Sequence, residues 1–134
     1  MAILTWSDKF SVGVQSIDDQ HAVLFDALNA LHSAMTKGHG RIMAGELLRD
    51  LVIHTGSHFA AEEALLDSAK YPGLAEHHQK HRILMRQMGG YIERFERGEI
   101  TLNLHLLNFL RDWLTIHIQT EDRACGAWLQ EHSE

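Results

Sequence analysis

Histidine is the residue type that sets this chain apart. Eleven of the 134 residues are histidine, whereas cysteine and proline occur once each. Two pairs of metal-ligating side chains are four residues apart, namely His58 with Glu62 and His77 with His81. Residues at this spacing lie one turn apart on the same side of an α-helix. Each pair would therefore present two ligands to a common site, provided that both segments are helical.

Hydrophobic spacing predicts the helices that would carry these pairs. Hydrophobic residues recur every three or four positions over about 17–37, 41–69, 74–97 and 102–129. We expect the first helix to open at Ser16, with Asp19 three residues on. The expected inward-facing residues include Val23, Leu24, Leu28, Leu31, Leu65, Leu66, Ile83, Leu84, Leu110 and Leu114.

The connections between these segments are short and contain glycine, which makes sequential helices antiparallel neighbours. The predicted fold class is all-α, an up-down antiparallel four-helix bundle over residues 17–131. Phe10, Val12 and Val14 alternate ahead of it and predict an extended N-terminal arm, residues 1–16, laid over the bundle. At this length we expect one domain, residues 1–134.

Antiparallel geometry then sets the height of each ligand along the bundle. Residues equidistant from a connecting turn lie at one level, because the helices have equal rise. By this rule position 58 is level with 81, and position 62 is level with 77. In the same way 81 is level with 117, 77 with 122, and 21 with 58. One layer therefore collects seven potential ligands from all four helices: His21, His58, Glu62, His77, His81, His117 and Asp122.

The pair His117 and Asp122 is the exception to regular spacing. Five residues on an ideal helix turn the side chain by about 140°, so both cannot face one site directly. Either Asp122 reaches round from the flank of its helix, or the backbone makes a wide π-type turn between the two residues. We favour the wide turn.

The ligand types narrow the metal. Imidazole suits iron, copper, nickel and zinc, and a carboxylate can bridge two ions. Five imidazoles, two bridging carboxylates and a bridging oxygen fill all but one position of two octahedral ions, which leaves a place for a small ligand. The sequence lacks the H-E-x-x-H motif of zinc proteases, the Glu-x-x-His motif of ferritin-type sites and the C-x-x-C-H motif of c-type haem.

These residues resemble the hemerythrin family, and its bacterial single-domain members in particular. The similarity runs through the whole chain: Trp6, Phe10-Ser-Val-Gly-Val14, Ile17-Asp-Asp-Gln-His21, His58-Phe-Ala-Ala-Glu62-Glu63, Tyr71-Pro72, His77-x-x-x-His81 and Trp113-Leu-x-x-His117-Ile-x-x-x-Asp122. The resemblance implies two iron ions per chain, bridged by an oxo or hydroxo group.

The resemblance also implies a role for each ligand. His77, His81 and His117 would hold one iron, and His21 and His58 would hold the other, five-coordinate iron, where O2 binds. Glu62 and Asp122 would bridge the two. An O2 carrier needs an apolar pocket that excludes water, and the residues beside the ligands on the helical wheel suit it, although they equally suit ordinary bundle core: Leu24, Phe59, Trp113, Leu114 and Ile118.

Other groups have simpler interpretations. We expect His54 to be a hydrogen-bonded histidine of the core or of the ligand surroundings, and Cys125 to be a small packed hydrophobe. The remaining histidines, expected to be bystanders, are His32, His39, His78, His105 and His132.

Composition restricts the partners. The formal charge is −6 and basic residues form no run, which argues against nucleic acid or an anionic membrane. The sequence shows neither an apolar run long enough to span a membrane nor the pattern of an export leader, so we expect a cytoplasmic protein. We also expect it to be a monomer. The expected function is reversible dioxygen binding for storage, transport or delivery, with dioxygen as the partner. The alternatives are an O2 or redox sensor, and a di-iron enzyme acting on peroxide or NO.

Overall fold

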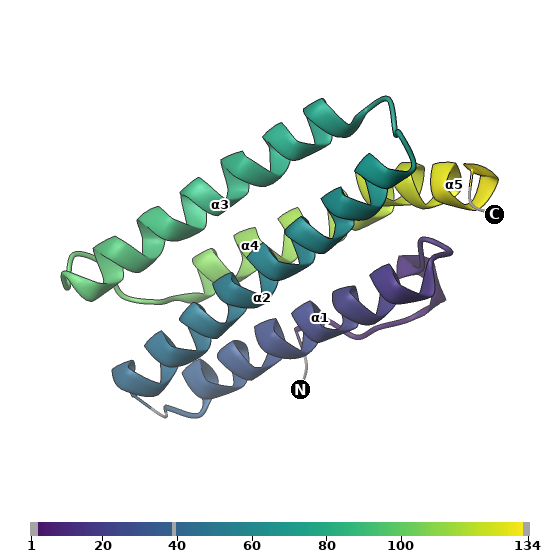
Figure 1. The fold of residues 1–134 in the computed structure, drawn as a ribbon. Helices are drawn as coiled ribbons and strands as arrows, with labels where there is room; N and C mark the ends of the chain where they lie inside the picture. Colours follow the sequence, from purple (N-terminus) through teal and green to yellow (C-terminus); the bar gives the residue numbers. More distant parts are fainter. Residues whose placement is uncertain (1–2, 39, 133–134) are drawn as a thin grey trace.

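The chain forms an antiparallel bundle whose long helices lie side by side (Figure 1). A computed structural model describes residues 3–38 and 40–132, so the expectations for His39 and for the ends of the chain lie outside the described residues. The predicted four-helix bundle is confirmed. Its helices are α1 (Gln15–Thr36), α2 (Arg41–Ser68), α3 (Leu74–Glu96), α4 (Leu104–His117) and α5 (Arg123–His132).

The fourth predicted helix is divided by a wide turn. Between α4 and α5 lies a π-helical segment, η2 (Ile118–Asp122), and the three follow one another along one path in Figure 1. The backbone N–H of Arg123 donates to the Ile118 carbonyl, five residues earlier. The predicted π-type turn is therefore confirmed. It widens the helix by about one residue per turn, which lets Asp122 face the same side as His117.

The start of α1 differs from the prediction. The helix begins at Gln15 after an extended Val14, with no side-chain cap, and Ser16 lies inside it. Asp18 serves the arm instead, because its carboxylate accepts hydrogen bonds from the Ser11 hydroxyl at 2.6 Å and from the Val12 N–H at 2.9 Å. The expected Ser16 cap was wrong because the first-turn carboxylate already fixes the approach of the chain.

The N-terminal arm covers one side of the bundle, but it is not extended throughout. A short 3-10 helix, η1 (Asp8–Phe10), interrupts it. Phe10 and Val12 are buried, and the Phe10 ring meets Phe25 of α1 edge-on, with centroids 4.9 Å apart. Against α5 the approach is so close that a Cβ atom on Gly126 would lie 2.0 Å from the Val12 carbonyl oxygen.

Replacing Gly126 with alanine should therefore destabilise the protein. The added methyl must push the arm backbone away, at a cost of about 1–3 kcal/mol in the free energy of unfolding. Gly89→Ala in α3 is the matched control, since its Cβ meets nothing within 4 Å and alanine favours a helix by about 1 kcal/mol. Urea denaturation should show opposite signs for the two variants. A stabilised Gly126→Ala protein would contradict this packing of the arm.

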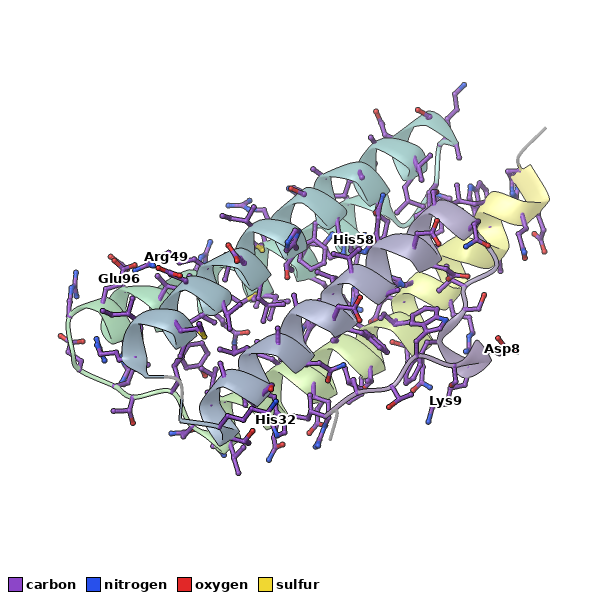
Figure 2. The ribbon with its side chains drawn as sticks, turned by 90° about the horizontal axis from the view of Figure 1, so that it is seen from below. Asp8, Lys9, His32, Arg49, His58 and Glu96 are labelled. Carbon is purple, nitrogen blue, oxygen red and sulfur yellow. The ribbon has the colours of Figure 1, made fainter. Side chains whose placement is uncertain are left out.

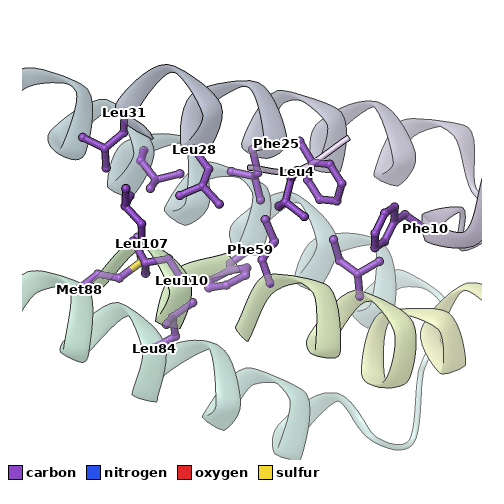
Figure 3. Packing of buried hydrophobic residues seen from close by; sticks show 14 of the residues in the cluster. Leu4, Phe10, Phe25, Leu28, Leu31, Phe59, Leu84, Met88, Leu107 and Leu110 are labelled. Atoms are coloured by element: carbon purple, nitrogen blue, oxygen red, sulfur yellow. The ribbon is translucent and has the colours of Figure 1, made fainter. Parts of the chain in front are cut away.

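The core is a continuous apolar column between the helices (Figure 3). Leu28 and Leu31 of α1 face Leu107 and Leu110 of α4, with Leu84 of α3 nearby. Three residues expected to face inward are exposed instead, and each is directly followed by a buried leucine: Val23, Leu65 and Ile83. On the surface, an ion pair of 3.6 Å joins Arg49 of α2 to Glu96 at the end of α3 (Figure 2).

In the described part of the chain, none of the helices combines the length and the apolar character that a membrane span requires.

Candidate metal centre

The seven predicted ligands meet in one buried layer. None of these residues is more than 4% exposed. They come from every part of the bundle: His21 from α1, His58 and Glu62 from α2, His77 and His81 from α3, His117 from the end of α4 and Asp122 from the end of η2. The equal-height rule thus placed all seven side chains together, although they are spread over about a hundred residues of sequence.

The layer divides into two sets of possible ligand atoms that share both carboxylates. One set contains His77, His81 and His117, and the other contains His21 and His58, each together with Glu62 and Asp122. Within each set the ligand atoms lie within 4.8 Å of one another. Two adjacent positions are therefore available, one facing three imidazoles and the other facing two.

The oxygen atoms of Glu62 are divided between the two positions. Oε1 lies 2.5 Å from Nε2 of His77 and 3.5 Å from Nε2 of His81, on the three-histidine side. Oε2 lies 3.5 Å from Nε2 of His58 and 4.0 Å from Nε2 of His21, on the two-histidine side.

Asp122 is divided in the same way. Its Oδ1 lies 3.0 Å from Nε2 of His117 and 3.2 Å from Nε2 of His77, while Oδ2 lies 3.0 Å from Nε2 of His21. Each carboxylate thus turns one oxygen to each position, which is the arrangement that a ligand bridging two cations requires.

Unpaired polar atoms test whether metal ions fit this layer. Several buried atoms have no hydrogen-bond partner among the described residues, and four of them point into the layer: Nε2 of His21, Nε2 of His58, Oε2 of Glu62 and Oδ1 of Asp122. Unpaired buried polar atoms cost free energy, and buried charges are paired or bind metals. Imidazole nitrogens with carboxylate oxygens form a donor set suited to iron and other first-row transition metals, so the residues fit.

The outer nitrogens of four of the five ligand imidazoles have neighbours that the sequence did not predict. Nδ1 of His58 donates to Oε1 of Gln20 at 2.6 Å, and Nδ1 of His81 donates to Oε2 of Glu63 at 2.8 Å. Nδ1 of His117 lies 3.6 Å from Oε2 of Glu121. A donor proton on Nδ1 leaves the Nε2 lone pair free for a metal.

The sequence positions of two of these partners could have indicated their role. Glu121 is four residues after His117, and Gln20 directly precedes His21 at the height of position 58. Cys125, expected as a packed hydrophobe, is fully buried but also takes part in a hydrogen bond, with its sulfur 3.6 Å from Nδ1 of His77.

The layer distributes protons unevenly when no metal is bound. Burial, followed by the nearby His21, lowers the pKa of His58 to about 3. Burial also lowers the pKa of His81 to about 4, despite its bond to Glu63. Burial acts to lower the pKa of His77 too, but contacts with Asp122, Cys125 and Glu62 raise it to about 12.

The metal-free protein should consequently lose stability in mild acid. Below about pH 6.5, His58 and His81 are protonated in the unfolded chain but stay neutral in the folded protein. Their contribution to stability is therefore fully present only above that pH. It is lost as the pH falls towards 4, by about 1.4 kcal/mol per pH unit for each histidine. His77 acts in the opposite sense, since its contribution is lost only as the pH rises above about 6.5.

Urea denaturation of metal-free protein at pH 6.5 and 4.5 measures this effect. His58→Gln should reduce the loss between the two pH values, whereas the matched variant of the exposed His54, His54→Gln, should leave it unchanged. Equal losses in both variants would show that His58 is not held neutral in the folded state.

The five residues expected around a small ligand are in two locations. Leu24, Trp113 and Leu114 line an apolar cavity of about 20 Å³, enough for a water-sized molecule. Phe59 and Ile118 are buried but do not line it. Phe59 stacks on the His81 ring with centroids 3.6 Å apart, and Trp113 stacks on His117 at 4.4 Å.

The expectation that His54 is a hydrogen-bonded histidine of the core or of the ligand surroundings was wrong. It is exposed and lines an open groove of about 330 Å³ between α1 and α2, which also reaches Gln20 and His58. A four-residue step turns the side chain by about 40°, and here that step carries it from the buried stripe to the surface. The described bystander histidines lie outside both ligand sets: His32, His78, His105 and His132.

These features define a class of protein, a four-helix bundle with a buried layer of histidines and carboxylates that could hold metal ions. Comparison with known proteins gives the family. Residues 12–129 match the family described as Hemerythrin HHE cation binding domain. The chain belongs to the hemerythrin family.

Individual relatives agree along nearly the whole chain. Bacteriohemerythrin of Stenotrophomonas maltophilia (strain R551-3) is 36% identical over 132 residues, which cover 98% of this chain and 85% of that protein. Bacteriohemerythrin of Methylococcus capsulatus (strain ATCC 33009 / NCIMB 11132 / Bath) is 33% identical, with 96% and 98% covered. The crystal structure of a wild-type hemerythrin superposes with a TM-score of 0.91 at 32% identity, covering 96% of this chain and 98% of that one.

Proposed function

We propose that this protein binds dioxygen reversibly at a di-iron centre and serves to store, carry or deliver it. The observation that carries the proposal is the division of the oxygens of Glu62 and Asp122 between a three-histidine and a two-histidine position. Membership of the hemerythrin family supports iron as the metal and dioxygen as the ligand. Bound iron would supply the electrons that hold dioxygen.

The ligands proposed for one iron are His77, His81 and His117, and those for the other are His21 and His58. Glu62 and Asp122 would bridge both ions. The position with two histidines has one ligand fewer, so it is the place where a small molecule would bind. Hydrogen bonds at the outer nitrogens orient His58 and His81, so that the Nε2 atom of each keeps its direction whether or not a ligand is present.

The surroundings of the layer support binding rather than turnover. Leu24, Leu114 and Ile118 are buried apolar residues within one turn of His21 and His117, and they exclude water from the layer. An enzyme acting on peroxide or NO needs a proton donor close to the reacting atoms. Among the described residues, Thr55 alone brings a hydroxyl group to the lining of the apolar cavity, and this hydroxyl already donates to the Leu51 carbonyl at 2.7 Å.

A cycle of visible spectra tests the proposal. Anaerobically reduced, iron-loaded protein should develop a new absorption band on exposure to air and lose it completely under argon, over repeated cycles. The same protein should consume added peroxide or NO no faster than its Asp122→Ala variant. A band that does not reverse, or rapid peroxide or NO consumption by the unaltered protein alone, would favour the enzyme instead.

A further inference from the structure

The groups behind the imidazoles differ between the two metal positions. On the three-histidine side, His81 donates to the carboxylate of Glu63 at 2.8 Å, and a second carboxylate, Glu121, lies 3.6 Å from His117. On the two-histidine side, His58 donates to the neutral amide of Gln20 at 2.6 Å. Nδ1 of His21 has no hydrogen-bond partner among the described residues.

Both carboxylates are fixed by further contacts on their outer sides. Glu63 also pairs with His78 on α3, and Glu121 pairs with Lys80 of the same helix. These contacts hold the carboxylates in place behind the histidines. Gln20 has a different setting, because it lines the open groove of about 330 Å³ between α1 and α2.

The charge of the acceptor matters for the metal. An imidazole that donates its outer N–H to a carboxylate becomes a more basic ligand, and a neutral amide has a weaker effect of the same kind. A more basic ligand stabilises the oxidised ion. Binding of dioxygen withdraws electron density from the metal, so the weaker donors of the two-histidine position weaken that binding.

We propose that Gln20 is a positioning residue that orients His58 without adding negative charge, and so keeps the two-histidine position poorer in electrons than the three-histidine position and able to release dioxygen. This inference rests on the proposed function. It assigns the asymmetry of the site to the outer partners Gln20 and Glu63, as well as to the number of histidines. Gln20 is half-buried at the groove, so a substitution of equal size need not disturb the core.

Reciprocal substitutions test the proposal. Gln20→Glu places a carboxylate behind His58, and Glu63→Gln places an amide behind His81, with almost no change of shape in either case. The reduction potential of the iron-loaded protein should fall in Gln20→Glu and rise in Glu63→Gln. Dioxygen release, followed by stopped-flow mixing with a dioxygen scavenger, should be several-fold slower in Gln20→Glu.

A measurement with Co2+ separates this effect from iron chemistry. Removal of an outer partner typically costs roughly 10- to 100-fold in metal affinity. Gln20→Ala should weaken binding of one of two Co2+ ions by about that factor, and Gln20→Glu should restore or strengthen it. Gln87→Glu and Glu93→Gln, at exposed positions of α3, control for the changed net charge.

The outcomes distinguish the two proposals. If the unaltered protein does not bind two metal ions or does not bind dioxygen reversibly, the proposed function fails. If it does both, but the two reciprocal variants shift the potential in the same direction or no more than the α3 controls, the role of Gln20 is refuted while the proposed function stands.

Discussion

Replacing Asp122 with alanine should empty both metal positions together. Asp122 turns Oδ1 towards His77 and His117, and Oδ2 towards His21, so its loss removes a ligand from each position. Iron per chain, measured by elemental analysis after removal of loosely bound metal, should fall from about two to near zero. Glu62→Ala should have the same effect, because its oxygens are divided in the same way.

Two other variants make this prediction specific. Asp26→Ala, at an exposed position on α1, should keep the full iron content. His58→Ala removes a ligand from the two-histidine position alone, so it should weaken one ion before the other. Retention of one firmly bound ion by Asp122→Ala would show that the carboxylate serves a single position.

Iron should also stabilise the fold strongly. The layer buries two carboxylates and five imidazoles with several unpaired atoms, and a metal that binds only the folded chain adds stability by mass action. At a thousand times the dissociation constant the gain is about 4 kcal/mol, which for a chain of this size raises the melting temperature by roughly 10 °C or more.

Thermal melts followed by circular dichroism measure this gain in metal-free and iron-loaded protein. The melting temperature of Asp122→Ala should not respond to iron, although the variant itself remains helical. Identical melting temperatures of the unaltered protein with and without iron would contradict a contribution of the ions to folding.

Much of the site followed from sequence because its geometry depends on few quantities. Helical rise and short turns place His21 level with His58, and Glu62 level with His77, and these quantities hardly vary between helices. The five-residue spacing between His117 and Asp122, by contrast, was compatible with two geometries. The structure shows the π-helical one.

The predictions of burial were wrong where the rotation of a residue about the helix axis, rather than its height along the bundle, decides whether it is buried. Val23 and Leu24 are adjacent and both apolar, yet only Leu24 is buried, because the packing of neighbouring helices selects the buried face. The prediction that His54 lies in the core or beside the ligands was wrong for the same reason. The contact of Gly126 with Val12 depends on the path of the arm, which no periodic pattern reports.

The outer partners of the histidines were harder still. Glu63, Glu121 and Gln20 are polar residues on helix surfaces, where such residues are usually solvated. Only the orientation of each imidazole shows which of these polar groups lies beside its outer nitrogen.

The most direct measurement of the central claim is the amount of dioxygen bound per iron. Measured amounts of dioxygen are added to reduced, iron-loaded protein in a sealed vessel that is otherwise free of air. The bound and the released gas are then quantified. One dioxygen should bind for every two irons in each chain, and argon should recover all of it. One dioxygen per single iron, or gas that is consumed and not recovered, would contradict a shared centre that binds dioxygen reversibly.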